Sequence, residues 1–149
     1  MELGRVAAME ESVSEILYED DGLCIKLHKA LSLIQLIFKK TPDLEHFRNG
    51  YSLAMDAAAM RGVRYWLTDA QEIKSMYPEN QVWLKQQMAP LLQTQLRRFA
   101  IVMAPECFVM TSPNQVYERP SPAPAEMPSG KIKVHFDKQA AYSWLLDQE

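Results

Sequence analysis

The sequence predicts a single α/β domain over residues 1–149, with a mixed sheet of about five to six strands and helices packed on it. Two alternating segments flank Asp20-Asp21-Gly22, which indicates an N-terminal antiparallel hairpin. Apolar strands then alternate with segments of helical period, as in parallel sheets joined by helices. A chain of 149 residues is also long enough to bury one core.

Three antiparallel strands are expected to begin the fold. Residues 14–20 and 22–29 alternate apolar and polar side chains, and Gly22 is expected to supply the positive φ of a tight turn. Residues 31–38 (LSLIQLIF) are apolar on both faces apart from Gln35, which indicates a central strand. The N-terminal part should therefore be a hairpin or meander.

A helix is expected to follow Thr41-Pro42-Asp43, where threonine can cap and proline suits the first position, and to end at Gly62 in a left-handed cap. Residues 63–67 (VRYWL) are the next strand, which reaches Thr68-Asp69 at its carboxyl end. Pro78 begins a second helix, and Pro90 should kink it or stop it early because proline lacks an N–H group.

The C-terminal third predicts two more strands and a closing helix. Residues 99–104 (FAIVMA) and 131–136 (KIKVHF) are the strands, and Asp137 caps the helix that follows. Residues 106–118 are expected to hold a short helix, and residues 119–130 (RPSPAPAEMPSG) a proline-rich loop.

Charge and composition exclude several classes of function. The chain has 16 basic and 19 acidic residues, a formal net charge of -3, and its basic pairs Arg97-Arg98 and Lys39-Lys40 are small, so neither a nucleic acid nor an anionic membrane is expected as a partner. Residues 1–12 are candidates for disorder and lack a signal-peptide core, and the apolar run 31–38 is far short of the ~20 residues that span a bilayer. Integral membrane association is therefore not expected.

Cys24 and Cys107 are the only cysteines, and neither is part of a CxxC pair. This fits a reducing, cytoplasmic location. The three histidines show no metal-ligand spacing, and no Gly-rich phosphate loop is present. We therefore expect neither a metal nor a cofactor.

Polar residues follow strand 63–67, at the strand end where open α/β sheets bind ligands. The candidate docking or regulatory residues here are Thr68, Asp69, Glu72, Ser75 and Tyr77. A phosphate on Ser75, or less directly on Thr68, would meet the positive end of the second helix. Asp69 has a second interpretation, as a turn residue that bonds backbone N–H groups.

Two other classes of function stay open. A small apolar or lipid-like ligand could occupy a pocket between helix and sheet, lined by Trp66, Trp83 and Met88. An enzyme would use Asp69 or Glu72 with His135 as acid and base. Self-association is a further expectation, through the exposed edge of the first hairpin.

Several segments resemble small bacterial STAS-like proteins, related to the anti-sigma-factor antagonist domain. They are WLTDAQEI (66–73), PENQVWL (78–84), Ala89-Pro90, FAIVMAPE (99–106) and FDKQAAYSWL (136–145). The resemblance runs from about Tyr65 onward, and the family's Asp-Ser regulatory pair is replaced by Thr68-Asp69-Ala70. It implies a non-enzymatic regulatory module that docks a protein partner through residues 68–77.

Overall fold

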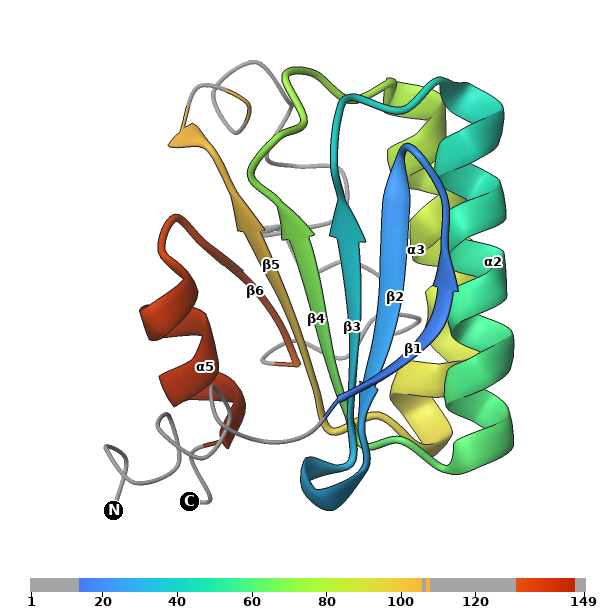
Figure 1. Cartoon of the computed structure of the whole chain (residues 1–149), viewed down its shortest axis with the longest axis vertical. Helices are drawn as coiled ribbons and strands as arrows, with labels where there is room; N and C mark the ends of the chain where they lie inside the picture. The colour runs from blue at the N-terminus through green and yellow to red at the C-terminus, as the bar shows by residue number, and fades with distance from the viewer. Residues whose placement is uncertain (1–13, 106, 108–130, 147–149) are drawn as a thin grey trace.

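The structure, a computed structural model, describes residues 14–105, 107 and 131–146. One six-stranded sheet has the order β1-β2-β3-β4-β5-β6 (Figure 1). The strands are β1 (Glu15–Glu19), β2 (Leu23–His28), β3 (Leu33–Phe38), β4 (Tyr65–Ala70), β5 (Arg98–Met103) and β6 (Ile132–His135). The helices are the 3₁₀ turn η1 (Lys29–Leu31) and the α-helices α2 (Leu44–Arg61), α3 (Pro78–Thr94) and α5 (Lys138–Leu146).

The first two strand pairs are antiparallel and the last three are parallel. The expected mixed sheet with an N-terminal antiparallel meander is therefore confirmed. The expectations for residues 1–12, 108–118 and 119–130 lie outside the described residues. Among the residues that the structure describes, no helix is long and apolar enough to cross a membrane.

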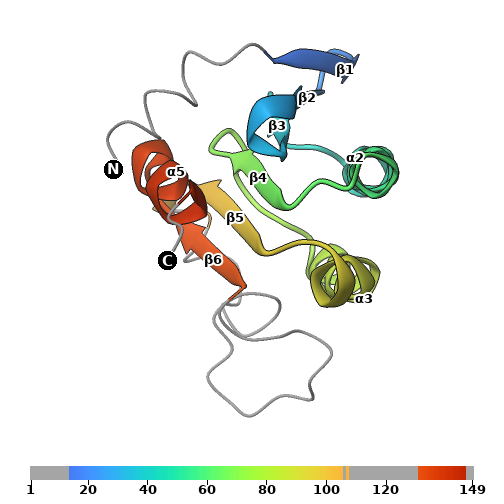
Figure 2. The same ribbon diagram turned by 90° about the horizontal axis from the view of Figure 1, so that it is seen from below.

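Helices cover both faces of the sheet (Figure 2). Helices α2 and α3 pack on one face, where Trp66 and Phe99 belong to the larger core. Helix α5 packs on the other face, where Leu67 and Ala100 belong to the smaller core. Neighbouring residues of β4 and β5 thus enter different cores, because successive side chains of a strand point to opposite faces.

Strand β4 is longer at its carboxyl end than the sequence predicted. It runs from Tyr65 to Ala70, so Thr68 and Asp69 lie inside the strand and pair with neighbours on both sides. Thr68 shares the face of Trp66, toward α2 and α3, whereas Asp69 shares the face of Leu67, toward α5. The two polar residues therefore have different surroundings.

The predicted C-cap of α2 is confirmed, whereas the predicted N-cap was wrong. The N-cap is Asp43, not Thr41, and its Oδ1 accepts from the His46 N–H at 2.7 Å. The Thr41 hydroxyl instead accepts from the backbone N–H of Lys74 at 2.8 Å. Gly62 has a φ of 62° and ends the helix as predicted, and its backbone N–H donates to the carbonyls of Ala58 and Ala59.

Helix α3 begins at Pro78 as predicted but continues through Pro90 to Thr94, so the early stop was wrong. Leu92, which lies beyond the proline, is fully buried, and its packing holds the last turn in place. Asp137 caps α5 as predicted, since its Oδ2 accepts from the Ala140 N–H at 2.9 Å.

A small polar network lies inside the larger core. The Trp66 Nε1–H donates to the Thr68 hydroxyl at 2.8 Å, and that hydroxyl is also 2.8 Å from the Tyr51 hydroxyl. The Trp66 ring is stacked between Tyr51, at 5.8 Å, and Phe99, at 5.5 Å. One threonine hydroxyl therefore satisfies the polar atoms of two buried aromatic residues.

We expect Thr68→Val to lower the free energy of unfolding by about 1–3 kcal/mol, because it leaves two buried polar atoms without a partner. Tyr51→Phe keeps the bond from Trp66 and should cost only about 1 kcal/mol. Urea unfolding of the two variants measures the difference. Equal stability of Thr68→Val and the parent chain would show that the network contributes nothing.

Candidate functional site

Four connections meet at the end of the sheet where β3, β4 and β5 finish, uppermost in Figure 1. They are the β1–β2 turn (20–22), the β3–α2 connection (39–43), the β4–α3 loop (71–77) and the residues that follow β5. Every candidate docking residue lies at this end, although the side chains differ in exposure.

Thr68 lies in the core and not on the surface. Only 1% of the residue is exposed, and its hydroxyl is used by Tyr51 and Trp66. A kinase or a partner protein could reach this hydroxyl only after the strand opened. We therefore leave Thr68 out of the docking surface.

Asp69 is buried at the end of β4 under the first turn of α5. Its Oδ1 accepts from the backbone N–H and the side-chain amide of Gln71, both at 3.2 Å. Its Oδ2 is 3.6 Å from the Lys138 ammonium group. This matches the turn interpretation of Asp69: the carboxylate fixes the chain as it leaves β4 and links it to α5.

The loop 71–77 has no regular secondary structure but is anchored to the domain. Ile73 is buried, and its N–H donates to the Ala70 carbonyl at 3.1 Å. The bond from Lys74 to Thr41 ties the middle of the loop to the β3–α2 connection. On either side of these anchors, the side chains of Glu72, Ser75 and Tyr77 are exposed.

The three residues of the predicted apolar pocket, Trp66, Trp83 and Met88, belong to or pack against the larger core. Trp66 has both ring faces filled by Tyr51 and Phe99, and Met88 is fully buried in the same core. Trp83 is half-buried, and its ring lies 5.5 Å from the Arg48 guanidinium group. The Arg48 Nε–H also donates to Asn80, so this contact joins α2 to α3.

Asp69 and His135 occupy one row of the sheet, but with Val102 between them. Two strand spacings of ~4.8 Å separate their backbones, and the carboxylate bonds to Gln71 and Lys138 instead. Among the described residues, the buried Nε2 of His135 has no hydrogen-bond partner. The geometry thus keeps Asp69 apart from His135, one of the two acid–base pairs that the enzyme hypothesis named.

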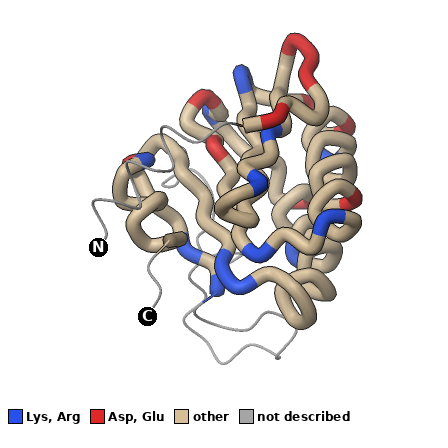
Figure 3. The backbone as a smooth tube through the Cα atoms, turned by 60° about the horizontal axis from the view of Figure 1, so that its bottom comes forward, with Lys and Arg blue, Asp and Glu red and all other residues tan. Residues whose placement is uncertain are grey.

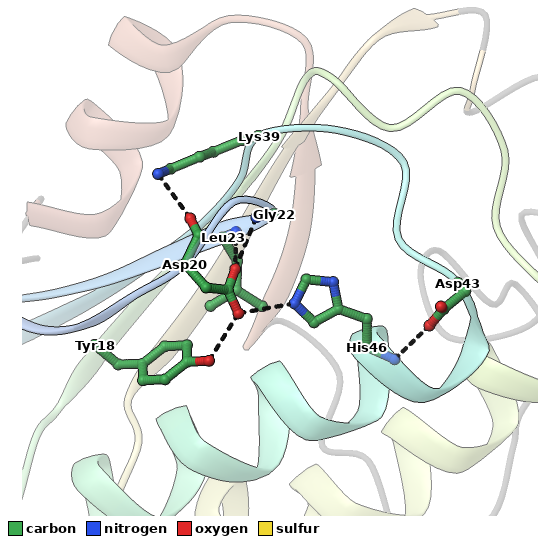
Figure 4. Close-up of polar contacts among 7 residues, drawn as sticks. All are labelled: Tyr18, Asp20, Gly22, Leu23, Lys39, Asp43 and His46. Atoms are coloured by element: carbon green, nitrogen blue, oxygen red, sulfur yellow. Dashed lines mark hydrogen bonds and ion pairs between the residues drawn. The ribbon is translucent and has the colours of Figure 1, made fainter.

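A polar cluster that sequence reasoning missed is centred on Asp20, in the β1–β2 turn (Figure 4). Oδ1 accepts from the N–H groups of Gly22 and Leu23, at 2.7 and 3.0 Å. Oδ2 is 2.7 Å from the Tyr18 hydroxyl, which donates to it, and 3.1 Å from His46 Nε2 on α2. The bond from Tyr18, with those from the backbone and His46, holds the pKa of Asp20 well below its ordinary 3.8.

Gly22 is required for space and not for a positive φ, which corrects the expected reason for a glycine in this turn. A Cβ atom at this position would lie 2.2 Å from Cε1 of the His46 ring. The His46 ring, in the first turn of α2, therefore lies directly over Gly22, and it would have to move if this residue carried a Cβ atom. The Asp-Asp-Gly sequence marked the turn, but no local pattern marks its contact with a helix more than twenty residues later.

Comparison of the chain with protein-family models, with curated proteins and with solved structures finds no significant match in any of the three. The resemblance to STAS-like domains consequently stays a prediction, and the function must be argued from the site itself.

Gly22→Ala should destabilise the domain by about 1–3 kcal/mol, because the His46 ring has to leave its place over the turn. In a His46→Ala background the same change should cost much less. Gly62→Ala is a matched control: a Cβ there meets open space, and its cost comes from the φ of 62°, so it should not depend on His46. Additive effects of Gly22→Ala and His46→Ala in chemical unfolding would contradict the close contact.

His135 gives the domain a pH dependence. Burial, with the charge of Lys133 nearby, lowers the pKa of His135 from its ordinary 6.5. The folded state therefore resists a proton that the unfolded chain accepts, so stability is full above about pH 6.5 and falls as the pH drops below it. His135→Gln should remove this part of the slope, measured as the unfolding free energy at about pH 7.5 and about pH 5.5. An unchanged slope would assign the titration to another group.

Proposed function

We propose that this protein is a non-enzymatic interaction module that docks a protein partner through the loop 71–77. The observation that carries the proposal is the combination of exposure and anchoring in this loop: Glu72, Ser75 and Tyr77 face solvent while Ile73 and the bond from Lys74 hold the backbone. A segment held in place before binding loses little conformational entropy in the complex.

Tyr77 is the strongest single contact in this proposal. It is 49% exposed at the N-cap of α3, and its side chain makes no capping bond to the helix. Tyrosine is enriched among residues that dominate binding energy, because it buries a large ring at small entropic cost. Glu72 gives the surface a negative charge, which favours a partner with a basic contact.

A STAS-like regulatory role is the finer form of the same proposal, and Ser75 is its modification site. Ser75 is exposed and lies three residues before Pro78, so a phosphate there would sit near the N-terminus of α3. A Ser75→Glu variant should change the affinity for the partner without unfolding the domain.

The test is site-specific photo-crosslinking in the native cell, with a photoreactive amino acid in place of Tyr77. We expect one defined protein adduct. The matched control replaces Leu53, which is 43% exposed on α2, and should not give that adduct. Tyr77→Ala should then weaken binding of the purified partner by at least about thirty-fold, the loss expected for a dominant contact residue.

The same adducts at positions 77 and 53 would indicate non-specific collision. Tight binding of the partner to Tyr77→Ala would move the docking surface elsewhere. Self-association through the first hairpin is distinguished by the mass of the adduct, which would then be that of two copies of this chain.

A further inference from the structure

Basic residues from distant parts of the sequence meet at the amino ends of the parallel strands, opposite the loop 71–77. The basic end consists of Lys29, Arg61, Arg64 and Arg97. Backbone bonds connect three of its positions: the Ser32 N–H donates to the Lys29 carbonyl at 3.1 Å, the Arg64 N–H to the Ser32 carbonyl at 3.0 Å, and the Arg97 N–H to the Arg64 carbonyl at 2.7 Å. Arg61 ends α2, just before Gly62.

The charges of the basic end are uncompensated. All four residues are exposed, and no ion pair or side-chain hydrogen bond is formed by any of them within the described part of the chain. Arg64 and Arg97 directly precede the adjacent strands β4 and β5, whose backbones are ~4.8 Å apart. Like charges so close raise each other's energy, and an anion would relieve this.

Capping of helix C-termini accounts for other cations at this end, but not for these. Lys131 donates to the carbonyls of Leu92 and Leu96 at the end of α3, and Arg98 donates to the Trp144 carbonyl in α5. Gln95 donates to the carbonyls of Ala58 and Val63 at 2.8 Å. Arg61 lies in the last turn of α2, where its charge favours the helix dipole, and Lys29 lies in the short η1 turn, but Arg64 and Arg97 belong to no helix.

The net charge of -3 therefore hides a separation of charge along the sheet. Figure 3 shows a group of Lys and Arg where the lower end comes forward, whereas in the upper part Lys and Arg are interspersed with most of the Asp and Glu. Acidic residues at the opposite end include Asp20, Asp21, Asp43, Glu72 and Glu79. The protein can therefore present one positive end to an anionic partner.

Exposed apolar atoms beside the charges point to the class of partner. Met60, next to Arg61, is 82% exposed, and Ala30 is exposed in the η1 turn, which protrudes at the bottom of Figure 1. The exposed aromatic residues of the described chain, Tyr18, Tyr77 and Phe136, lie elsewhere, and Tyr65 beside Arg64 is partly buried against the smaller core, so bases of a nucleic acid would find no fully exposed ring to stack on here. A bilayer surface offers both phosphate groups and an apolar layer for Met60.

From these observations we infer that the basic end docks on a membrane surface rich in anionic phospholipid. The contact is peripheral: each basic residue near such a surface contributes modestly, and four of them with one inserted side chain give reversible binding.

The test is co-sedimentation of the full chain with vesicles made of equal parts phosphatidylcholine and phosphatidylglycerol, at low salt. We expect binding to these vesicles and none to phosphatidylcholine alone. The Arg64→Gln, Arg97→Gln double variant should partition about thirty-fold more weakly, and Met60→Ser about three- to five-fold more weakly. The matched control is Lys40→Gln, Lys74→Gln, which removes the same charge from the other end and should stay within about two-fold of the parent.

Far-UV circular dichroism confirms that each variant is folded. Absence of binding to the mixed vesicles, or equal losses in the two double variants, would overturn the inference. So would binding of a single-stranded RNA oligonucleotide through Arg64 and Arg97 with no binding to vesicles. These outcomes are independent of the photo-crosslinking result at Tyr77, because the two surfaces share no residue.

Discussion

The parallel register of β3, β4 and β5 is the constraint on which both proposed surfaces depend. Leu33 pairs with Tyr65, and Tyr65 with Arg98, so the three strands start level and finish level. All their carboxyl ends, and the loops that follow, are therefore at one end of the sheet. All their amino ends, with Arg64 and Arg97, are at the other. A change in strand direction would mix the docking loop with the basic residues.

The polar side chains of β4 keep that register. A slip of one residue would exchange the faces of Thr68 and Asp69, because side chains alternate along a strand. The carboxylate of Asp69 would then face the core under α2 and α3, away from Lys138, and the buried Tyr51 hydroxyl would lose its partner because Thr68 moves to the other face. Both consequences are costly in an apolar interior. Thr68 and Asp69, which the sequence predicted as site residues, thus have a structural role first, and the proposed docking surface is the loop beyond them.

The sequence predicts what local patterns control. The alternation of apolar and polar residues predicted the hairpin, and the helical period predicted α2, α3 and α5. Short-range capping patterns identified Gly62 and Asp137 as helix caps. It does not predict what depends on contact between distant segments. Thr41 was assigned a cap that Asp43 makes, because its real partner, Lys74, is in another loop. Gly22 was assigned the wrong reason, because His46 lies in a helix. The basic end escaped notice because its members are separated in the chain and only the sheet brings them together.

The net charge of a chain does not describe the potential at one end of its surface, because charges act over a limited distance. A strand of six residues is ~20 Å long at ~3.3 Å per residue, so the two ends of the sheet are separated by at least that distance. At physiological ionic strength the Debye length is ~8 Å, so an anionic surface at the basic end is screened from the acidic loops. A protein with an excess of negative charge can then bind a negative surface. In that orientation the loop 71–77 points away from the bilayer, and Tyr77 stays accessible to a partner while the basic end is occupied.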